Sequence, residues 1–275
     1  MGFSSDVLSI EKQNAVAIVW LDREEKYNAM SSAVWLAIPQ ALEEIVSDSD
    51  IGAVVIAGRG KHFCVGVDLA ETAINPQKTA KADSQAKANL QQLEITSGFQ
   101  KAISAVADCP LPVIGVIHGF CLGAGVDLIT ACDIRIASAD AIFSVRETRI
   151  GLVADVGTLQ RLPKILNAGH VAESAYTGKD IDAQRAEKIG LINDVYDTSE
   201  LALQAGLAMA NEIAANSPMA VRGTKFMLQQ NENLTTEQSL MLNGMFTMMT
   251  SLQSNDLKEG IKAFTERRPP KFTGS

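Results

Sequence analysis

The stretch "PLPVIGVIHGFCLGAGVDLITACDIRIAS", residues 110–138, contains the clearest indication of the fold class. It begins with the apolar run LPVIGVIHG (111–119), which predicts a buried strand, because such runs are typical of parallel strands covered on both faces. A turn of small residues, GAG (123–125), leads into an apolar segment that is expected to be a helix. DIRIAS (133–138) has the character of the next strand, so the stretch as a whole indicates an α/β fold.

Outward from this stretch, strand-like and helix-like segments continue to alternate. NAVAIVWLD (14–22) and GAVVIAG (52–58) are rich in Val and Ile, and the residues between them carry apolar side chains at roughly helical spacing. A long helix is expected from about 87 to 107, and another strand at AIFSV (141–145). The polar segment over 72–86 is expected to be a mobile loop. Because parallel neighbours in a sheet need crossover connections, the alternation predicts an α/β core with parallel strands.

The character of the sequence changes after Tyr196. Helical segments follow one another there, with no strand-like run between them. We therefore expect a core over residues 1–200 and a helical region over 201–275. A methionine-rich stripe within 241–249 is expected to pack against the core or against another subunit.

Composition and charge set limits on the class of protein. The length of 275 residues suits one large domain with an appendage, and 47% hydrophobic with 20% charged residues is ordinary for a soluble globular protein. The net charge of -8 repels phosphate groups, so we expect neither nucleic-acid binding nor nonspecific binding to anionic membranes. The longest apolar run is interrupted by Pro112, by glycines and by His118, and falls short of a membrane span.

Four cysteines, Cys64, Cys109, Cys121 and Cys132, lie in apolar segments without the spacing of a zinc site. We expect buried free thiols, which suits a reducing compartment. The first residues lack a basic segment followed by an apolar run, and Asp6 stands where a myristoylation motif has Ser or Thr. A cytoplasmic location and no bound metal are therefore expected.

Two glycine-containing turns after predicted strands are the first candidates for chemistry. GRGKHFCVGVDL (58–69) follows the strand at 52–58, and HGFCLGAGVDL (118–128) follows the strand at 111–117. Backbone N–H groups in such turns can converge on an anionic oxygen, and a helix N-terminus adds partial positive charge. Together the turns could form an oxyanion hole, whereas each alone is ordinary turn structure. Neither matches a Walker phosphate loop or a dinucleotide-binding fingerprint.

Three acidic residues stand in mostly small or apolar surroundings. Asp127 begins the expected helix after the second turn, and Glu147 and Asp155 lie in RETRIGLVADVGTLQRLP (146–163). Asp127 could simply favour the helix N-terminus. Glu147 and Asp155 could each be a surface or salt-bridged charge, or the two could be paired acid/base groups in the wall of a pocket. The residue pattern alone leaves these interpretations open.

The two turns and three acids, in this order, resemble the crotonase (enoyl-CoA hydratase/isomerase) superfamily over most of the chain. The resemblance is carried by REEKYNAMS, GKHFCVGVDL, PLPVIGVIHGFCLGAGVDLITACDIRIAS, FSVRETRIGLVADVGTLQRLP and SPMAVRGTK. It implies a crotonase-type ββα spiral core and a helical C-terminal region for trimerisation, in a homotrimer or homohexamer. It also implies no metal or redox cofactor, since CoA enters as part of the acyl-CoA substrate.

The acids indicate a subgroup of this family. Its enoyl-CoA hydratases usually carry Glu at the positions of both Asp127 and Glu147, and a glycine-rich segment around position 155. Asp155, with Asp127 and Glu147 before it, resembles the Δ3,5-Δ2,4-dienoyl-CoA isomerases. The resemblance implies that these three residues are catalytic and that two carboxylates move a proton between C2 and C6 of a 3,5-dienoyl-CoA. We prefer Asp155 as the C2 base and Glu147 as the C6 acid, although the sequence does not fix this assignment.

Other functions remain open at this point. An enoyl-CoA hydratase and a Δ3-Δ2-enoyl-CoA isomerase are the nearest alternatives, and a noncatalytic RNA-binding or scaffold protein on the same fold is a more distant one. For an enzyme, the resemblance assigns the oxyanion hole to the backbone N–H groups of Val67 and Ala124. It implies substrate or CoA contacts for Arg23, Lys26, Val65, Gly66, Asp68, Leu69 and Gly125.

Overall fold

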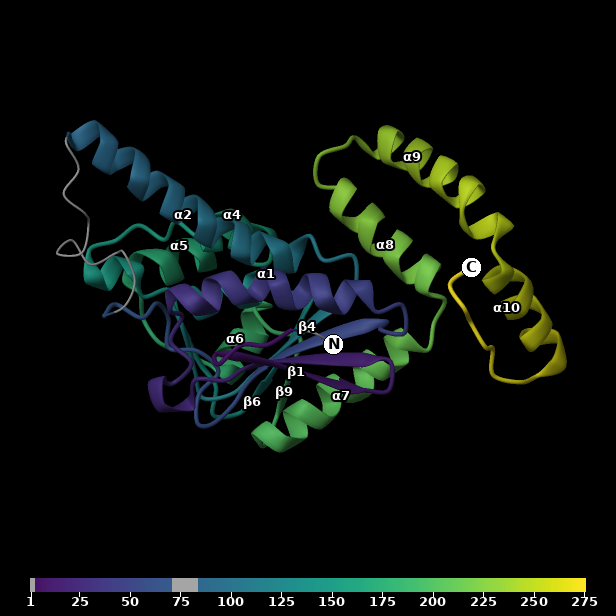
Figure 1. The fold of residues 1–275 in the computed structure, drawn as a ribbon, viewed down its shortest axis with the longest axis horizontal. Coiled ribbons are helices and arrows are strands. Elements are labelled where there is room, and N and C mark those ends of the chain that lie inside the picture. The colour runs from purple at the N-terminus through teal and green to yellow at the C-terminus, as the bar shows by residue number, and fades with distance from the viewer. Residues whose placement is uncertain (1–2, 71–83) are drawn as a thin grey trace.

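A mixed six-stranded sheet forms the centre of the computed structural model, which describes residues 3–70 and 84–275 (Figure 1). Most of the loop expected over 72–86 therefore lies outside the described residues. The strands follow the order β1 (Leu8–Gln13), β2 (Val16–Leu21), β3 (Ala53–Gly58), β4 (Val113–Ile117), β6 (Ile134–Ser138) and β9 (Asp194–Tyr196). β1 and β2 are antiparallel, and every later pair of neighbours is parallel. The predicted α/β class with parallel strands is confirmed.

A second, three-stranded sheet follows directly from β4. It consists of β5 (Phe120–Leu122), β7 (Ile142–Ser144) and β8 (Ile181–Asp182), with β5 and β7 parallel and β7 and β8 antiparallel. Gly119, with a φ of 53°, turns the chain from β4 into β5. A Cβ at this position would lie 2.4 Å from the carbonyl oxygen of Lys61, so the turn requires glycine.

Both faces of the sheet are buried at β2, β3 and β4, which explains the uninterrupted apolar runs of these strands. In β2, Ala17, Val19 and Leu21 enter the core on one face, while Val16, Ile18 and Trp20 enter the core on the other. Figure 1 shows α1 (Ser32–Ser47) and α7 (Ser199–Ala214) on opposite sides of the strands. The second core includes Ala202 and Ala210 of α7, so this helix packs on the sheet.

α2 (Gln85–Ala107) corresponds to the long helix expected from about 87 to 107, and it packs beside α1. Ser84 caps its start by accepting a hydrogen bond from the N–H of Lys87 at 3.2 Å. The rings of Trp35 in α1 and Phe99 in α2 stack with centroids 4.7 Å apart. This contact fixes the C-terminal half of α2 over the core.

Short helices connect the remaining strands. They are η1 (Glu24–Lys26), α3 (Ala124–Thr130), η2 (Glu147–Ile150), α4 (Thr158–Arg161), η3 (Leu162–Lys164), α5 (Ala168–Thr177) and α6 (Ala183–Ile189). All four cysteines are free and buried, as predicted. Within residues 3–70 and 84–275, no helix combines the length and the apolar character needed to cross a bilayer.

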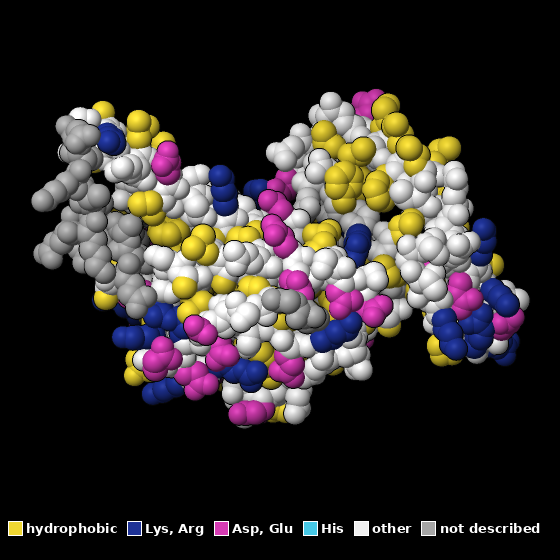
Figure 2. All heavy atoms as spheres, in the orientation of Figure 1, with side chains coloured by type: hydrophobic (Ala, Val, Ile, Leu, Met, Phe, Trp, Pro, Cys, Tyr) yellow, Lys and Arg dark blue, Asp and Glu magenta, His cyan; other side chains and the backbone are white. Residues whose placement is uncertain are grey.

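The chain after α7 forms helices that extend to one side of the core in Figure 1. They are α8 (Pro218–Gln230), α9 (Thr236–Met249), η4 (Ser251–Gln253) and α10 (Asn255–Glu266). α8 is attached through the buried Lys225, whose Nζ donates to the carbonyl oxygen of Leu111 at 2.9 Å and to Asp133 at 2.7 Å. The methionine stripe of α9 is exposed in the single chain, and Figure 2 shows hydrophobic side chains gathered over this region. Packing of this stripe against another subunit stays a prediction.

Candidate active site

The two glycine turns lie side by side beyond the carboxyl ends of β3 and β4. Cys64 and Cys121 pair in a parallel bridge. The N–H of Cys64 donates to the carbonyl oxygen of Phe120 at 3.0 Å, and the N–H of Leu122 donates to the carbonyl oxygen of Cys64 at 2.9 Å. The structure thus brings together two turns that are more than fifty residues apart in the sequence.

Glycines allow this close approach. Gly66 has a φ of 102°, and a Cβ there would lie 3.1 Å from the carbonyl oxygen of Leu122. Gly123 has a φ of 51°, and a Cβ there would lie 3.3 Å from Oε1 of Glu147. A side chain at position 66 would therefore push the two turns apart, and one at position 123 would push the second turn away from Glu147. Gly125 is buried, and a Cβ there would lie 2.9 Å from the carbonyl oxygen of Cys64, so its observed contacts are internal.

The proposed oxyanion-hole donors are not engaged elsewhere. Within the described part of the chain, the N–H groups of Val67 and Ala124 donate to no other protein atom. Val67 is held from both sides, because the N–H of Met30 donates to the Gly66 carbonyl oxygen at 2.8 Å and the N–H of Asp68 donates to the Met30 carbonyl oxygen at 3.1 Å. Ala124 is the first residue of α3, where the helix dipole is positive. Both groups are therefore available to a ligand oxygen.

Glu147, in η2, is buried next to the second turn. Its Oε2 atom has no hydrogen-bond partner among the described residues. Burial raises the pKa of this carboxyl to about 7; its own backbone N–H opposes the shift, and the nearby Asp127 and Asp155 add to it. A carboxyl with a pKa near neutrality can both accept and donate a proton at physiological pH.

Asp127, in α3, is buried and connects this helix to α4. Its Oδ1 atom accepts a hydrogen bond from the backbone N–H of Thr158 at 2.6 Å. Burial raises the pKa of Asp127 to about 6, while the contacts with Thr158 oppose the shift. One carboxylate oxygen is therefore committed to the first residue of α4.

Asp155 lies in the loop before α4 and is more exposed than the other two acids. Partial burial of its carboxyl raises the pKa, and its own backbone N–H opposes the shift. The charge of Asp155 acts on both Asp127 and Glu147, so the three carboxyls occupy one neighbourhood. The structure thus brings together the three acids that the sequence singled out. In residues 3–70 and 84–275, no cluster of His, Cys, Asp and Glu is arranged to hold a metal ion.

Two of the predicted CoA-binding residues have internal contacts. Arg23 and Asp68 form an ion pair at 3.3 Å with side chains 9% and 10% exposed. Arg23 also donates to the carbonyl oxygen of Ala29 at 2.6 Å, so the pair joins the segment after β2 to the first glycine turn. Lys26 and Leu69 are exposed and Val65 is half-buried. That any of these five residues contacts CoA stays a prediction.

Two further contacts, one made by Asp155 and one by Asp127, were not predicted from the sequence. The side chain of Gln100 in α2 donates to the backbone carbonyl oxygen of Asp155 at 2.6 Å, across 55 residues of sequence. The contact between Thr158 and Asp127 spans 31 residues. Neither residue type nor spacing signals such a pairing, because it depends on how α2, α3 and α4 pack.

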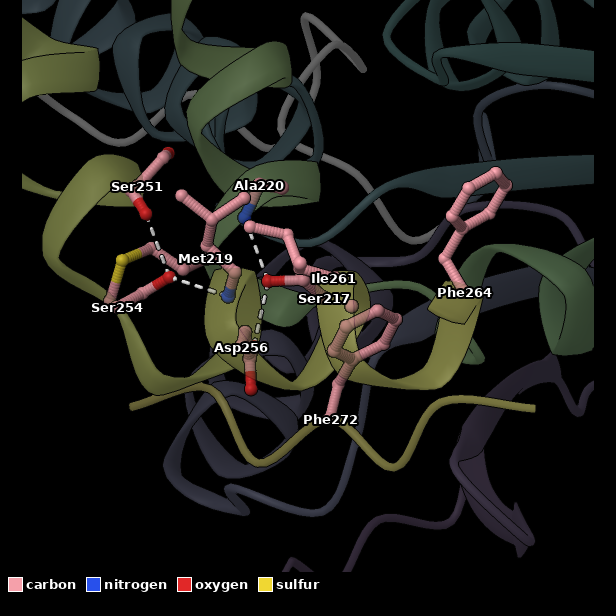
Figure 3. A pocket seen from close by; sticks show the side chains of 11 residues that line it. Ser217, Met219, Ala220, Ser251, Ser254, Asp256, Ile261, Phe264 and Phe272 are labelled. Carbon is pink, nitrogen blue, oxygen red and sulfur yellow. Dashed lines mark hydrogen bonds between the residues drawn. The ribbon is translucent and has the colours of Figure 1, made fainter. Parts of the chain in front are cut away.

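A separate pocket lies in the C-terminal region, between α8, η4 and α10 (Figure 3). Asp256 points towards Ser217 there and accepts a hydrogen bond from its hydroxyl at 2.7 Å. Apolar side chains such as Ile261 and Phe272 form much of the lining. None of the predicted site residues lines this pocket, so it is not the candidate active site.

Comparisons with known proteins place the chain in a family. The sequence model of the enoyl-CoA hydratase/isomerase family matches residues 11–275. The mitochondrial Δ3,5-Δ2,4-dienoyl-CoA isomerase of Dictyostelium discoideum is 39% identical over 272 residues, covering 96% of this chain and 90% of that protein. The Homo sapiens protein of the same name is 40% identical over 257 residues, covering 93% of this chain and 78% of that protein.

A solved structure shows the same architecture. The crystal structure of a putative enoyl-CoA hydratase from Streptomyces coelicolor A3(2) superposes with a TM-score of 0.89 at 29% sequence identity. The match covers 98% of this chain and 94% of that one. The crotonase-type fold expected from the sequence is confirmed.

Proposed function

This chain belongs to the enoyl-CoA hydratase/isomerase family and is an isomerase acting on acyl-CoA, and we propose that it converts a 3,5-dienoyl-CoA into the 2,4-dienoyl-CoA. The observation that carries the proposal is the position of Glu147. Its buried carboxyl, with a pKa of about 7, lies against a turn with a free N–H donor, and a second acid, Asp155, lies in the same neighbourhood.

The reaction needs one base, one acid and a site for negative charge. A carboxylate removes a proton from C2, and the electron pair of the C–H bond enters a conjugated enolate that extends to the thioester oxygen. A carboxylic acid then delivers a proton to C6, so the double bonds move from positions 3 and 5 to positions 2 and 4. The N–H groups of Val67 and Ala124 would stabilise the enolate oxygen in the meantime.

The location of the two acids supports an assignment of their roles. The thioester carbon is adjacent to C2, so a substrate whose oxygen binds at Ala124 has C2 close to the second turn. Glu147 lies against Gly123 of that turn, whereas Asp155 lies in the more exposed loop before α4. We therefore assign Glu147 as the C2 base and Asp155 as the C6 acid, which reverses the preference based on sequence alone.

Asp127 has a different part in this scheme. In a hydratase of this family, the acid at its position is expected to help hold the attacking water. Here one oxygen of the Asp127 carboxylate accepts the N–H of Thr158, within the segment that carries Asp155. This contact supports a role for Asp127 in holding the segment that carries Asp155.

A comparison of substrates tests the proposal. The purified protein should convert 3,5-dienoyl-CoA to the 2,4-isomer faster than it hydrates 2-enoyl-CoA or moves the double bond of 3-enoyl-CoA. The hydratase alternative has a counterpart in the solved structure from Streptomyces coelicolor, a putative enoyl-CoA hydratase. Faster hydration than dienoyl isomerisation would overturn the proposal in favour of that alternative.

The proposal includes an oligomeric state. Met241, Met245, Met248 and Met249 of α9 are more than half exposed in the single chain, which supports burial between subunits of a homotrimer or homohexamer. Light scattering at micromolar concentration would show three or six subunits, and a monomeric mass would contradict this.

For location we keep the cytoplasm, to be tested by cell fractionation, although the two relatives above are named mitochondrial.

A further inference from the structure

The loop that carries Asp155 has little support from its own backbone. Within the described residues, the backbone groups of 153–156 make no hydrogen bond to another backbone group. The buried side chains of Ala154 and Val156 anchor it on the inside. The orientation of Asp155 between these two anchors therefore depends on contacts from side chains elsewhere in the fold.

Gln100 supplies such a contact. Its Nε2 atom donates to the backbone carbonyl oxygen of Asp155 at 2.6 Å. The preceding residue, Phe99, is buried and stacks on Trp35 of α1, so the backbone from which Gln100 projects is firmly held. The hydrogen bond thus connects Asp155 to the packed interface between α1 and α2.

A second contact from the same face of α2 holds the other end of the segment. Ser104, one helical turn after Gln100, accepts a hydrogen bond from the guanidinium of Arg161 at 3.0 Å. Arg161 ends α4 and lies over Gly157, where a Cβ would clash with its guanidinium. α2 therefore contacts the segment from Asp155 to Arg161 near both ends.

We propose that Gln100 is a positioning residue for proton delivery by Asp155. The inference rests on the proposed function, and it adds to that function a residue in α2, outside the three acids and the two donor turns. Proton transfer requires a donor oxygen within hydrogen-bond reach of the carbon, so a shift of the Asp155 backbone moves the acid away from C6. The C2 base, Glu147, is held in η2 and does not depend on this bond.

The experiment compares Gln100→Met with Gln160→Met. Methionine has nearly the size of glutamine and favours helices, but it cannot donate to the Asp155 carbonyl oxygen. Gln160 lines the same surface depression as Gln100 and Asp155, and within the described residues its side chain makes no hydrogen bond. Isomerisation of 3,5-dienoyl-CoA is followed in D2O, and deuterium at C2 of the recovered substrate is measured beside product formation.

Gln100→Met should lower kcat about tenfold, as expected for one lost hydrogen bond, with little change in KM. The ratio of C2 deuterium exchange to product should rise, because the enolate still forms but is protonated at C6 more slowly. Gln160→Met should match the wild type in both measurements. General damage to the fold would lower exchange and product together.

Three results would overturn the inference. The first is a Gln100→Met variant with wild-type kcat and exchange ratio, and the second is a parallel loss of exchange and product. Either leaves the proposed function intact, because the wild type still isomerises the diene. The third, a wild-type protein without dienoyl-CoA isomerase activity, would overturn the proposed function together with the inference.

Discussion

The Oδ1 atom of Asp127 accepts the backbone N–H of Thr158 at 2.6 Å, which joins α3 to the start of α4, directly after the loop that contains Asp155. The first residue of α3, Ala124, carries one of the two N–H groups proposed for the oxyanion hole. The short helix α3 thus carries the Ala124 N–H at its start. Through Asp127 it also holds the segment that follows Asp155. The distance between the enolate oxygen and the C6 acid would depend on this connection.

Replacement of Asp127 tests that connection. Asp127→Asn keeps an oxygen that can accept from Thr158, so we expect a folded enzyme with a modest loss of rate. Asp127→Ala leaves the Thr158 N–H unpaired in a buried site and should lower the free energy of unfolding by about 1–3 kcal/mol. Urea unfolding and kcat, measured for both variants, check this expectation. If Asn is as damaging as Ala, the charge of Asp127 matters more than the hydrogen bond.

Replacement of Glu147 tests the assignment of the C2 base. Glu147→Gln keeps the size of the side chain but removes the ionisable group, so both C2 deuterium exchange and isomerisation should fall by ~10²-fold or more. In the wild type, the profile of kcat/KM against pH should be bell-shaped with one limb near pH 7, because Glu147 must be ionised while Asp155 keeps its proton. Glu212→Gln, on the exposed surface of α7, serves as the control. Retained C2 exchange in Glu147→Gln would return the role of base to Asp155.

Replacement of Asp155 should separate the two half-reactions. Asp155→Asn removes the carboxyl that we propose as the C6 acid, so product formation should fall by ~10²-fold or more. C2 exchange should persist, since Glu147 still removes and returns a proton. Mass spectrometry of recovered substrate from D2O measures the exchange. A variant that isomerises at the wild-type rate would point to a single-acid mechanism.

The parts of the fold that could be predicted are those marked by a pattern among residues close together in the sequence. β2 and β3 are runs of apolar residues because both of their faces are buried, and this pattern is visible in the residues themselves. β1 was not predicted: it lies at the edge of the sheet, and its residues LSIEKQ become more exposed towards its end. The strands β5, β7 and β8 are two or three residues long and form through contacts across the fold, and only β7 lay within an expected strand.

In the candidate active site, too, only part of the arrangement could be predicted from the sequence. The glycine turns and the three acids could be identified from the sequence and the family resemblance, but the partners of the acids could not. Asp127 pairs with Thr158, and Asp155 with Gln100, across 31 and 55 residues. The buried ion pair of Arg23 with Asp68, across 45 residues, was not predicted either. Such pairs depend on the packing of elements that spacing along the chain does not reveal.

The pKa of Glu147 predicts how stability changes with pH. Burial raises it from 4.5 to about 7, so between these pH values the folded state binds more protons than the unfolded state. The contribution of this group to the free energy of unfolding is therefore greatest at low pH and is lost as pH rises towards 7. Relative to the wild type, Glu147→Gln should gain on the order of 3 kcal/mol over that interval. Urea unfolding of both proteins near each limit measures this, and a difference independent of pH would contradict the raised pKa.

The N–H of Ala124 can be removed without removing the helix that it begins. Proline is well tolerated at the first position of a helix, because the N–H of that residue has no partner within the helix. Ala124→Pro should therefore leave α3 folded but delete one of the two donors to the enolate oxygen. We expect a loss of 10²- to 10³-fold in kcat, of about the size seen when one donor is removed from other oxyanion holes.

The matched variant is Ala124→Ser, which keeps the N–H and adds one oxygen at a site that is 1% exposed. It should lose some stability by burying a hydroxyl but retain most of the rate. Circular dichroism and urea unfolding establish that both proteins are folded, and kcat on 3,5-dienoyl-CoA then compares them. Both substitutions disturb the packing at this position, but only Ala124→Pro removes the N–H. A difference in rate between the two folded variants therefore reports on that N–H. Equal rates for two folded variants would exclude the Ala124 amide from the oxyanion hole.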